Sequence, residues 1–289
     1  MLRMSFLEHL EELRSRLIKI LIGMGVAFIV SLAFASPLWN IIAAPAVKAL
    51  ETLGINPPQL AQITPMEAFN TIWVKIPLLC AVFLASPWVL YQVWAFISPG
   101  LYRRERRWAV PFIVCSAGLF ILGGLFAYFV AFRYGLTFLL GIGLGSHVIP
   151  LISISTYSDM FVNVVLGVGL VFELPVLIFF LTLLRIVNPQ FLLNHSRYAI
   201  LAIFILAAVI TPTPDAFNMM LFATPMCLLF FVGIFASYLL VLNREGRRFP
   251  WSRVLIPGLI VLALLAGGLI LAITKFGWHL VPRWPFFTK

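Results

Sequence analysis

Charged side chains are scarce in this chain of 289 residues. Asp, Glu, Lys and Arg together make up 10% of the sequence, against 62% hydrophobic residues, and the mean hydropathy is +1.07. A soluble domain carries about 25% charged residues. The composition therefore excludes a water-soluble protein. It predicts an all-α integral membrane protein, because long apolar runs cross a bilayer as helices.

Negative charge is the scarcer sign, with 10 acidic against 20 basic residues. In a soluble protein this surplus of positive charge would suggest nucleic-acid binding. Here the basic residues fall between apolar runs, where they anchor the chain to anionic lipid and fix its topology. We therefore expect the lipid bilayer as a partner, and no nucleic acid.

Cysteine, histidine and catalytic motifs are also sparse. The three cysteines lie in apolar segments without a CxxC pair, the four histidines are scattered across loops, and no HExxH or GxSxG motif occurs. We expect no metal site, no cofactor and no enzymatic activity. The chain also has no visible internal repeat, which counts against a multispanning small-molecule transporter, the alternative function.

Seven apolar runs are the predicted membrane spans. They cover residues 17–35, 72–96, 108–131, 160–184, 198–210, 217–242 and 254–274. Fourteen Lys and Arg residues flank the spans on one side and six on the other, so the N-terminus is expected in the cytoplasm and the C-terminus outside. The AFA sequence at 33–35 resembles a signal-peptidase site, but the acidic N-terminal flank predicts a retained helix.

The fifth span is short, since about 13 residues reach only about 20 Å and the hydrocarbon core is about 30 Å thick. Either the following turn, TPTPD at 211–215, lies below the membrane surface, or the bilayer is thinned there. We expect the connections at 37–71 and 132–159 to be external loops that form a cap of short helices. Five prolines are expected to interrupt and bend the later spans: Pro77, Pro87, Pro111, Pro175 and Pro225.

The segment SFLEHLEELRSR, residues 5–16, predicts an amphipathic helix at the cytoplasmic surface. Ser5 and Glu8 form a capping box, and the helix is expected to continue into the first span. Glu11 and Arg14 are three residues apart and Glu12 and Arg16 are four apart, so both pairs are expected to form. A solvated face with weak ion pairs explains the segment without any functional role, and this alternative stays open.

Glu173 is an acid inside the fourth span. A carboxylate at the centre of a membrane helix costs about 2.5 to 3.5 kcal/mol on insertion scales, so it has to face protein or water. Two alternatives remain: a protonated Glu hydrogen-bonded to a neighbouring helix, or a polar patch for a partner or passing substrate. Gln92 either lines the same groove or bonds to the backbone.

Two further acids lie in turns. Asp215 precedes the sixth span at the N-cap position, where its carboxylate accepts from exposed backbone donors, and a capped turn is also compatible with a contact point. Glu105 lies in RRERR at 103–107, between spans two and three. Four arginines already fix this turn on one side of the membrane, so the lone acid among them needs a separate function.

These motifs resemble those of the TatC family, the multispanning signal-peptide receptor of the twin-arginine protein translocase. The similarity covers about residues 5–245 in the family's order and spacing. It rests on HLEELRSRL at 9–17, APAVK around Pro45, SPWVLYQVWAFISPGLYRRERRWAVP at 86–111, FAYF at 126–129, FELPV at 172–176 and TPTPDAFN at 211–218.

The resemblance implies a glove-shaped bundle of six transmembrane helices with cytoplasmic termini. Such a protein works with TatA-like and TatB-like single-span subunits and with other TatC copies to export folded proteins, using the proton-motive force. In the family, two cytoplasmic acids that match Glu12 and Glu105 recognise the paired arginines of the signal peptide. A carboxylate accepts a guanidinium in bidentate fashion, which lysine cannot reproduce. We assign Gln92, Phe96 and Arg14 to the same site.

Further positions follow from the resemblance alone. It implies that Glu173 and Tyr128 form a polar docking region within the membrane, for partner helices or for the apolar segment of the signal peptide. It also places Pro45 in the external loop and Asp215 in the external turn.

The C-terminus departs from the family. Residues 254–274 form an apolar run between Arg253 and Lys275, which predicts a seventh span. We therefore expect a translocase domain at 1–245, and then a cytoplasmic linker, an extra transmembrane helix and a short external tail at 246–289. The expected location is the cytoplasmic membrane of a prokaryote.

Overall fold

The computed structural model describes residues 6–97, 109–145, 151–211, 213, 215–247, 279–280 and 287–288. The chain divides into two compact units, Met1–Tyr238 and Leu239–Lys289. In the second unit the strands β1 (His279–Leu280) and β2 (Phe287–Thr288) form an antiparallel pair. The predicted seventh span, 254–274, lies outside the described residues.

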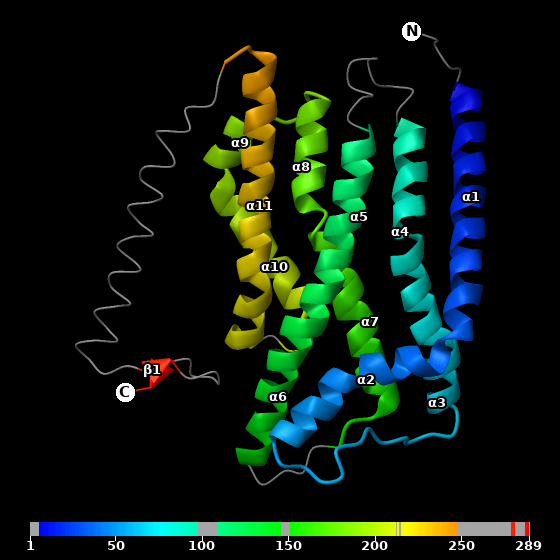
Figure 1. Ribbon diagram of the computed structural model, residues 1–289. Helices are drawn as coiled ribbons and strands as arrows, with labels where there is room; N and C mark the ends of the chain where they lie inside the picture. The colour runs from blue at the N-terminus through cyan, green and yellow to red at the C-terminus, as the bar shows by residue number, and fades with distance from the viewer. Residues whose placement is uncertain are drawn as a thin grey trace. The chain divides into compact units, whose positions relative to one another are not determined.

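The described part of the first unit is helical, and most of its helices run lengthwise beside one another (Figure 1). The order is α1 (Phe6–Ala33), α2 (Ala35–Thr52), α3 (Glu67–Asn70), η1 (Thr71–Lys75), α4 (Ile76–Ile97), α5 (Ala109–Phe126), η4 (Ala127–Phe132), α6 (Arg133–Gly145), α7 (Ile154–Val171), α8 (Leu174–Leu183), α9 (Pro189–Asn194), α10 (Ser196–Ile210) and α11 (Ala216–Arg244). Here η marks a π-helical turn. The buried core lies between α2, α4, η4, α7, α10 and α11.

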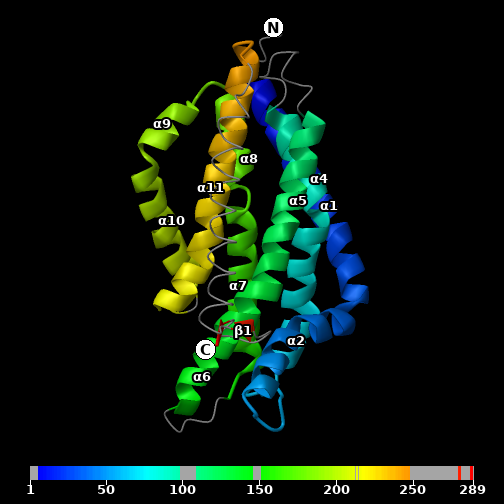
Figure 2. The same cartoon turned by 60° about the vertical axis from the view of Figure 1, so that its left-hand side comes forward.

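Five helical stretches among the described residues are long and apolar enough to cross a membrane. They are Leu7–Ala33, Glu67–Ile97, Val110–Gly143, Ile154–Leu183 and Ala216–Arg244. The fifth predicted span corresponds to α10, whose 15 residues reach only about 22 Å. Figure 2 shows α9 and α10 following one another at the edge of the bundle. The first six predicted spans, including the short one, are thus confirmed as apolar helices.

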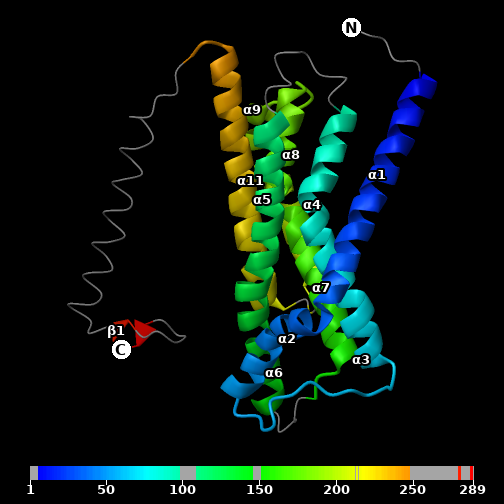
Figure 3. The ribbon, with the colours of Figure 1, turned by 45° about the vertical axis from the view of Figure 1, so that its right-hand side comes forward.

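The first helix is continuous from the amphipathic segment into the first span, as predicted. It lies beside α4 (Figure 3), where Gly23 faces the Trp88 ring. Trp88 also donates from Nε1 to the Lys19 carbonyl at 2.9 Å. Because only 11% of the α1 span is buried within the protein, most of its apolar surface is left for lipid. The predicted cap residue Ser5 lies outside the described residues.

The two connections that we predicted to form a cap of short helices do contain helices. The first holds α2, which lies across the bundle with Pro45 buried inside it, and α3. The second begins with α6, which lengthens the third apolar stretch to Gly143, beyond its predicted end at residue 131. Helix α6 contains several glycines. Each glycine weakens a helix by about 1 kcal/mol relative to Ala, but glycine is frequent in membrane helices, because backbone groups there have to pair within the helix.

The two connections are joined to each other. Helices α2 and α6 pack together. Beyond them, the Ala61 N–H donates to the Ile152 carbonyl at 2.8 Å, and the Ile154 N–H donates to the Ala61 carbonyl at 3.0 Å. Buried Tyr157 donates its hydroxyl to the Ile42 carbonyl of α2 at 2.6 Å. These bonds fix α2 against the start of α7.

The five prolines act differently from one another. Pro87 and Pro225 lie inside the continuous helices α4 and α11, and Pro111 lies in the first turn of α5, where no backbone donor is needed. Pro77 is the second residue of α4, just after the π-helical turn η1, and only at Pro175 does one helix, α7, give way to another, α8. The expectation that every proline interrupts its span was therefore wrong.

Candidate functional site

Glu12 lies six residues after the first residue of α1, nearly two helical turns along it. Its Oε1 accepts a hydrogen bond from Arg16 Nη2 at 3.3 Å, so the pair predicted from the spacing is present. Its Oε2 is buried and has no hydrogen-bond partner. Burying a carboxylate oxygen without a donor costs free energy. Among the residues that the structure describes, no side chain uses this acceptor.

Arg16 connects this carboxylate to α4. Its Nη1 donates to Oε1 of Gln92 at 3.1 Å, across 76 positions of sequence. Gln92 is only 1% exposed, so its side chain is held inside the contact between the two helices. The guanidinium therefore joins an acid of α1 to an amide of α4.

A second link between the same helices lies nearby. The rings of His9 and Phe96 stack with centroids 4.5 Å apart and an interplanar angle of 16°. His9 precedes Glu12 by three residues, so it lies on the adjacent turn and on a similar face of α1. Glu12 is therefore placed between two contacts that hold the start of α1 against the end of α4.

The residues that we predicted for this site are only partly brought together. Glu12, Gln92 and Phe96 meet between α1 and α4. Arg14 is exposed and, within the described chain, takes part in no hydrogen bond or ion pair. The predicted pair of Glu11 with Arg14 is therefore absent from the described chain. Arg14 lies two positions beyond Glu12, about 200° away around the helix. Glu105 lies outside the described residues, eight positions after the end of α4.

Glu173 lies at the break between α7 and α8. Ser116 of α5 donates a hydrogen bond to its Oε2, whereas its Oε1 is buried without a partner. The bond to a neighbouring helix that we considered for this acid is therefore present. The unpaired Oε1 leaves one acceptor for a second donor, as the alternative of a docking patch requires.

Tyr128 has a different environment from Glu173. Its hydroxyl donates to the Ile41 carbonyl of α2 at 2.8 Å, so it connects η4 to α2. Twelve residues separate Tyr128 from Ser116, the partner of Glu173, which amounts to about 18 Å along the helix. The structure does not bring Tyr128 and Glu173 together.

Asp215 caps α11, as predicted. Its Oδ1 accepts from the Asn218 N–H at 2.8 Å, and its Oδ2 accepts from Asn218 Nδ2 at 2.8 Å and from Thr213 Oγ1 at 2.5 Å. Partial burial raises the pKa of Asp215, but the hydrogen bonds from Asn218 and Thr213 lower it, and the net pKa lies below the ordinary 3.8. The charged form of this carboxylate therefore stabilises the turn.

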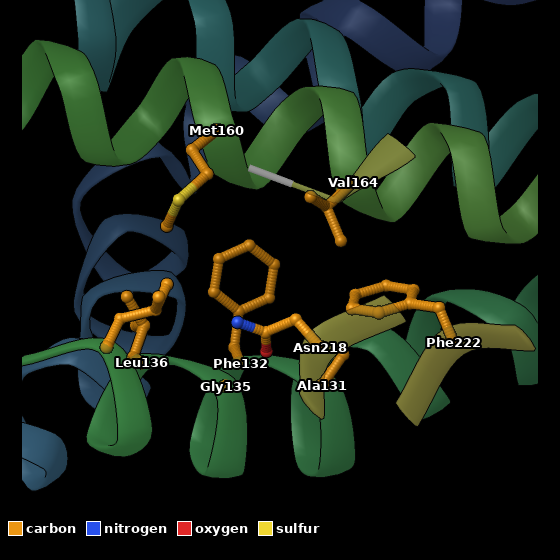
Figure 4. A pocket seen from close by; sticks show the side chains of 9 residues that line it. Ala131, Phe132, Gly135, Leu136, Met160, Val164, Asn218 and Phe222 are labelled. Atoms are coloured by element: carbon orange, nitrogen blue, oxygen red, sulfur yellow. The ribbon is translucent and has the colours of Figure 1, made fainter. Parts of the chain in front are cut away.

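Asn218 also lines a small cavity between η4, α6, α7 and α11. About 20 Å³ of it is free for the centre of a water molecule, which is room for one water. Figure 4 shows Met160 and Val164 of α7 pointing across the cavity toward Phe132 and Leu136. The polar Asn218 is the exception in a lining that is otherwise apolar.

No group of three or more His, Cys, Asp or Glu side chains that could hold a metal ion occurs in the part of the chain that the structure describes. The cysteines in these ranges, Cys80, Cys115 and Cys227, are free thiols. The described sites offer hydrogen-bond acceptors and apolar walls, and thus suit recognition of a donor-rich ligand.

Comparisons with known proteins point to one family. The family model described as Sec-independent protein translocase protein (TatC) matches residues 8–225. The TatC protein of Koribacter versatilis is 44% identical over 246 residues, covering 85% of this chain and 89% of that protein. The TatCy protein of Bacillus subtilis is 33% identical and covers 81% and 89%. A crystal structure of a twin-arginine translocase receptor, TatC, aligns with a TM-score of 0.68 at 34% identity, over 80% of this chain and 99% of that one.

Sequence reasoning missed several members of these sites. His9, Ser116 and Asn218 contact residues that we predicted, yet none was named as a site residue. The spacing of Asp215 and Asn218 fits an N-cap with its N3 donor, so that pair was open to sequence analysis. The partners on other helices, such as Ser116 for Glu173, leave no local signal.

Proposed function

Because the chain belongs to the TatC family, the receptor of the twin-arginine protein translocase, we propose that Glu12 and Glu105 receive the paired arginines of a signal peptide. The chain is a multi-pass membrane protein of a prokaryote and a component of a protein translocase. Each acid would accept one guanidinium, in a geometry that an ammonium group does not reproduce.

One observation supports this proposal above the others: the buried, unpartnered Oε2 of Glu12 beside Gln92 and Phe96. An acceptor without a donor lowers the free energy of the complex when a ligand supplies that donor. In the sequence, Glu105 follows the end of α4 by eight positions, and α4 is the helix that holds Gln92 and Phe96. Glu12 and Glu105 are therefore both close in sequence to residues of the contact between α1 and α4.

We further propose that Glu173 and Ser116 form a docking region for the single-span TatA-like and TatB-like subunits, or for the apolar part of the signal peptide. An intramembrane acid with one unpaired oxygen favours a partner that brings a polar group. Tyr128 supports this region only indirectly, by holding η4 to α2. Other copies of the chain remain proposed partners as well.

The test is crosslinking of a twin-arginine signal peptide to the full chain in membranes. Glu12→Gln and Glu105→Gln keep the shape of each side chain and remove its charge, and we expect each to reduce crosslinking and the double variant to abolish it. Glu11→Gln is the matched control, because Glu11 is exposed and adjacent to Glu12 in sequence. A peptide with both arginines changed to lysine is expected to crosslink poorly to the parent.

Undiminished crosslinking in the double variant would remove the proposed binding site. Equal losses in Glu12→Gln and Glu11→Gln would also contradict the proposal, because they would indicate a general charge effect. Both results are distinguishable from misfolding if each variant reaches the membrane in the amount of the parent.

A further inference from the structure

Glu12 does not present a free, exposed pair of oxygens to a ligand in this structure. Oε1 is occupied by Arg16 Nη2, and Oε2 is buried. A bidentate contact with a guanidinium needs both oxygens of a carboxylate. An incoming arginine can therefore form that contact only after Arg16 leaves Oε1 and the Glu12 side chain turns outward.

The bond that has to break is a loose one. Hydrogen bonds between a guanidinium and a carboxylate are typically about 2.7 to 2.9 Å long, and the Arg16–Glu12 contact is 3.3 Å. The side chains of Arg16 and Glu12 are 24% and 16% exposed, so water reaches the pair from one side. Arg16 is thus weakly bound to Glu12, and a ligand that binds the carboxylate more strongly can displace it.

Arg16 also has a partner that remains when Glu12 is taken. Its Nη1 donates to the buried Gln92 at 3.1 Å, and this bond does not involve Glu12. Loss of the carboxylate therefore does not leave the guanidinium without an acceptor. Gln92 keeps it beside α4 while a ligand binds.

We propose that Arg16 sets an affinity threshold for every ligand of Glu12: it is an internal guanidinium that occupies Glu12 and has to be displaced by an arginine of the signal peptide. The proposal rests on the proposed function, in which Glu12 receives that arginine. Displacement of Arg16 reduces the affinity of every ligand of Glu12 by the same factor, because each has to displace it. Ligands with lysine in place of arginine already bind weakly. The further loss of affinity that comes from displacing Arg16 keeps their occupancy of the site below the level needed for transport.

The test measures the binding of two synthetic signal peptides, one with paired arginines and one with paired lysines, to the full chain in lipid nanodiscs. We expect Arg16→Gln to tighten both by roughly two- to five-fold, the range of a partly exposed ion pair, and to leave the ratio between them unchanged. The same variant is expected to permit export of cargo carrying the lysine peptide. Arg16→Lys keeps the charge without the fork and is expected to give a smaller gain.

Two controls separate displacement from general electrostatics. Lys19→Gln removes one positive charge from an exposed position of α1, three residues beyond Arg16, and is expected to change affinity less than Arg16→Gln. In a Glu12→Gln background, Arg16→Gln is expected to have no effect, because no carboxylate remains for Arg16 to occupy.

A weaker or unchanged affinity in Arg16→Gln would overturn the inference, since it would mean that Arg16 positions Glu12 or is irrelevant to it. A gain that persists in the Glu12→Gln background would overturn it too. If Glu12→Gln alone leaves binding of the arginine peptide unaltered, the proposed function itself fails, and this outcome is distinct from the other two.

Discussion

Asn218 is a single side chain that holds the turn at Asp215 and also approaches α6. Its backbone N–H and its amide both donate to Asp215, and it is 1% exposed beside the small cavity. A Cβ added at Gly135 of α6 would lie 2.7 Å from Asn218 Oδ1. The absence of a side chain at Gly135 is therefore what allows Asn218 to approach α6 and still reach Asp215.

We predict that Gly135→Ala lowers thermal stability. The new methyl group forces Asn218 to move, and crowding of this kind costs about 1 to 3 kcal/mol, which lowers the midpoint of unfolding by a few degrees. Gly118→Ala in α5 is the matched control, because an added Cβ there meets nothing within 4 Å. Thermal unfolding in detergent measures both. Equal behaviour of the two variants would show that Asn218 accommodates the methyl group without loss.

Asp215 leads to a prediction about pH. Its pKa in the folded protein lies below the ordinary 3.8, so the unfolded chain binds its proton more readily. The stability that the charged carboxylate contributes is therefore fully present above about pH 4 and is lost as the pH falls through the folded pKa. As the pH is lowered below 4, we expect the temperature midpoint of unfolding to decrease less in Asp215→Asn than in the parent. Parallel pH profiles for the two proteins would contradict this assignment.

At the scale of elements, the pairing of α1 with α4 determines whether the proposed binding site exists. Helix α1 has few other contacts, since 11% of its span is buried, and Gly23 lets it approach the Trp88 ring. The same pairing brings Arg16 to Gln92 and His9 to Phe96. A loss of packing at Gly23 is therefore expected to reach Glu12 more than two turns away.

We predict that Gly23→Leu weakens crosslinking of a twin-arginine peptide, although it changes no residue of the proposed site. A Cβ at Gly23 would lie 2.3 Å from Trp88 Cδ1, so a leucine separates the helices. Gly25→Leu is the control on the same helix, where an added Cβ meets nothing within 4 Å and points to lipid. We expect about a ten-fold loss in the first variant, equivalent to about 1.4 kcal/mol, and little change in the second. Equal crosslinking of the two variants would show that binding of the signal peptide does not depend on the packing of α1 against α4.

At the scale of the whole molecule, the distribution of basic residues and the number of spans decide the topology. The sixth span ends at Arg244 within a group of basic residues, and the C-terminal part continues with the apolar run 254–274. Basic residues flanking a span stay in the cytoplasm. We therefore propose that residues near 245 are cytoplasmic, and that the run at 254–274 returns the chain to the outside.

This topology is testable with reporter fusions. A reporter that is active only outside the cytoplasm is expected to work after Lys289 and to fail after Glu245, and a reporter active only inside is expected to behave in the opposite way. Activity of the cytoplasmic reporter at both positions would show that residues 254–274 do not cross the membrane. Truncation after Glu245 then tests whether the translocase domain 1–245 is sufficient for signal-peptide binding.

The sequence by itself determined the membrane class, the first six spans and the cap at Asp215. Each of these depends on residues near one another in the chain: the cost of inserting a span is a sum over its own residues, and a cap is made within four positions. Local patterns placed the end of the third span too early, at residue 131, since the membrane environment favours a hydrogen-bonded helix and the helical stretch continues to Gly143.

Only the tertiary structure decided which polar groups meet. Arg16 and Gln92 are 76 positions apart, and Ser116 and Glu173 are 57 apart. Their contact depends on how small residues such as Gly23 let two helices approach, and on which faces then oppose each other. The charged residues to which we assign a function were thus visible in the sequence. That Glu12 holds one loosely occupied oxygen and one buried, unpartnered oxygen is a property of helix packing alone.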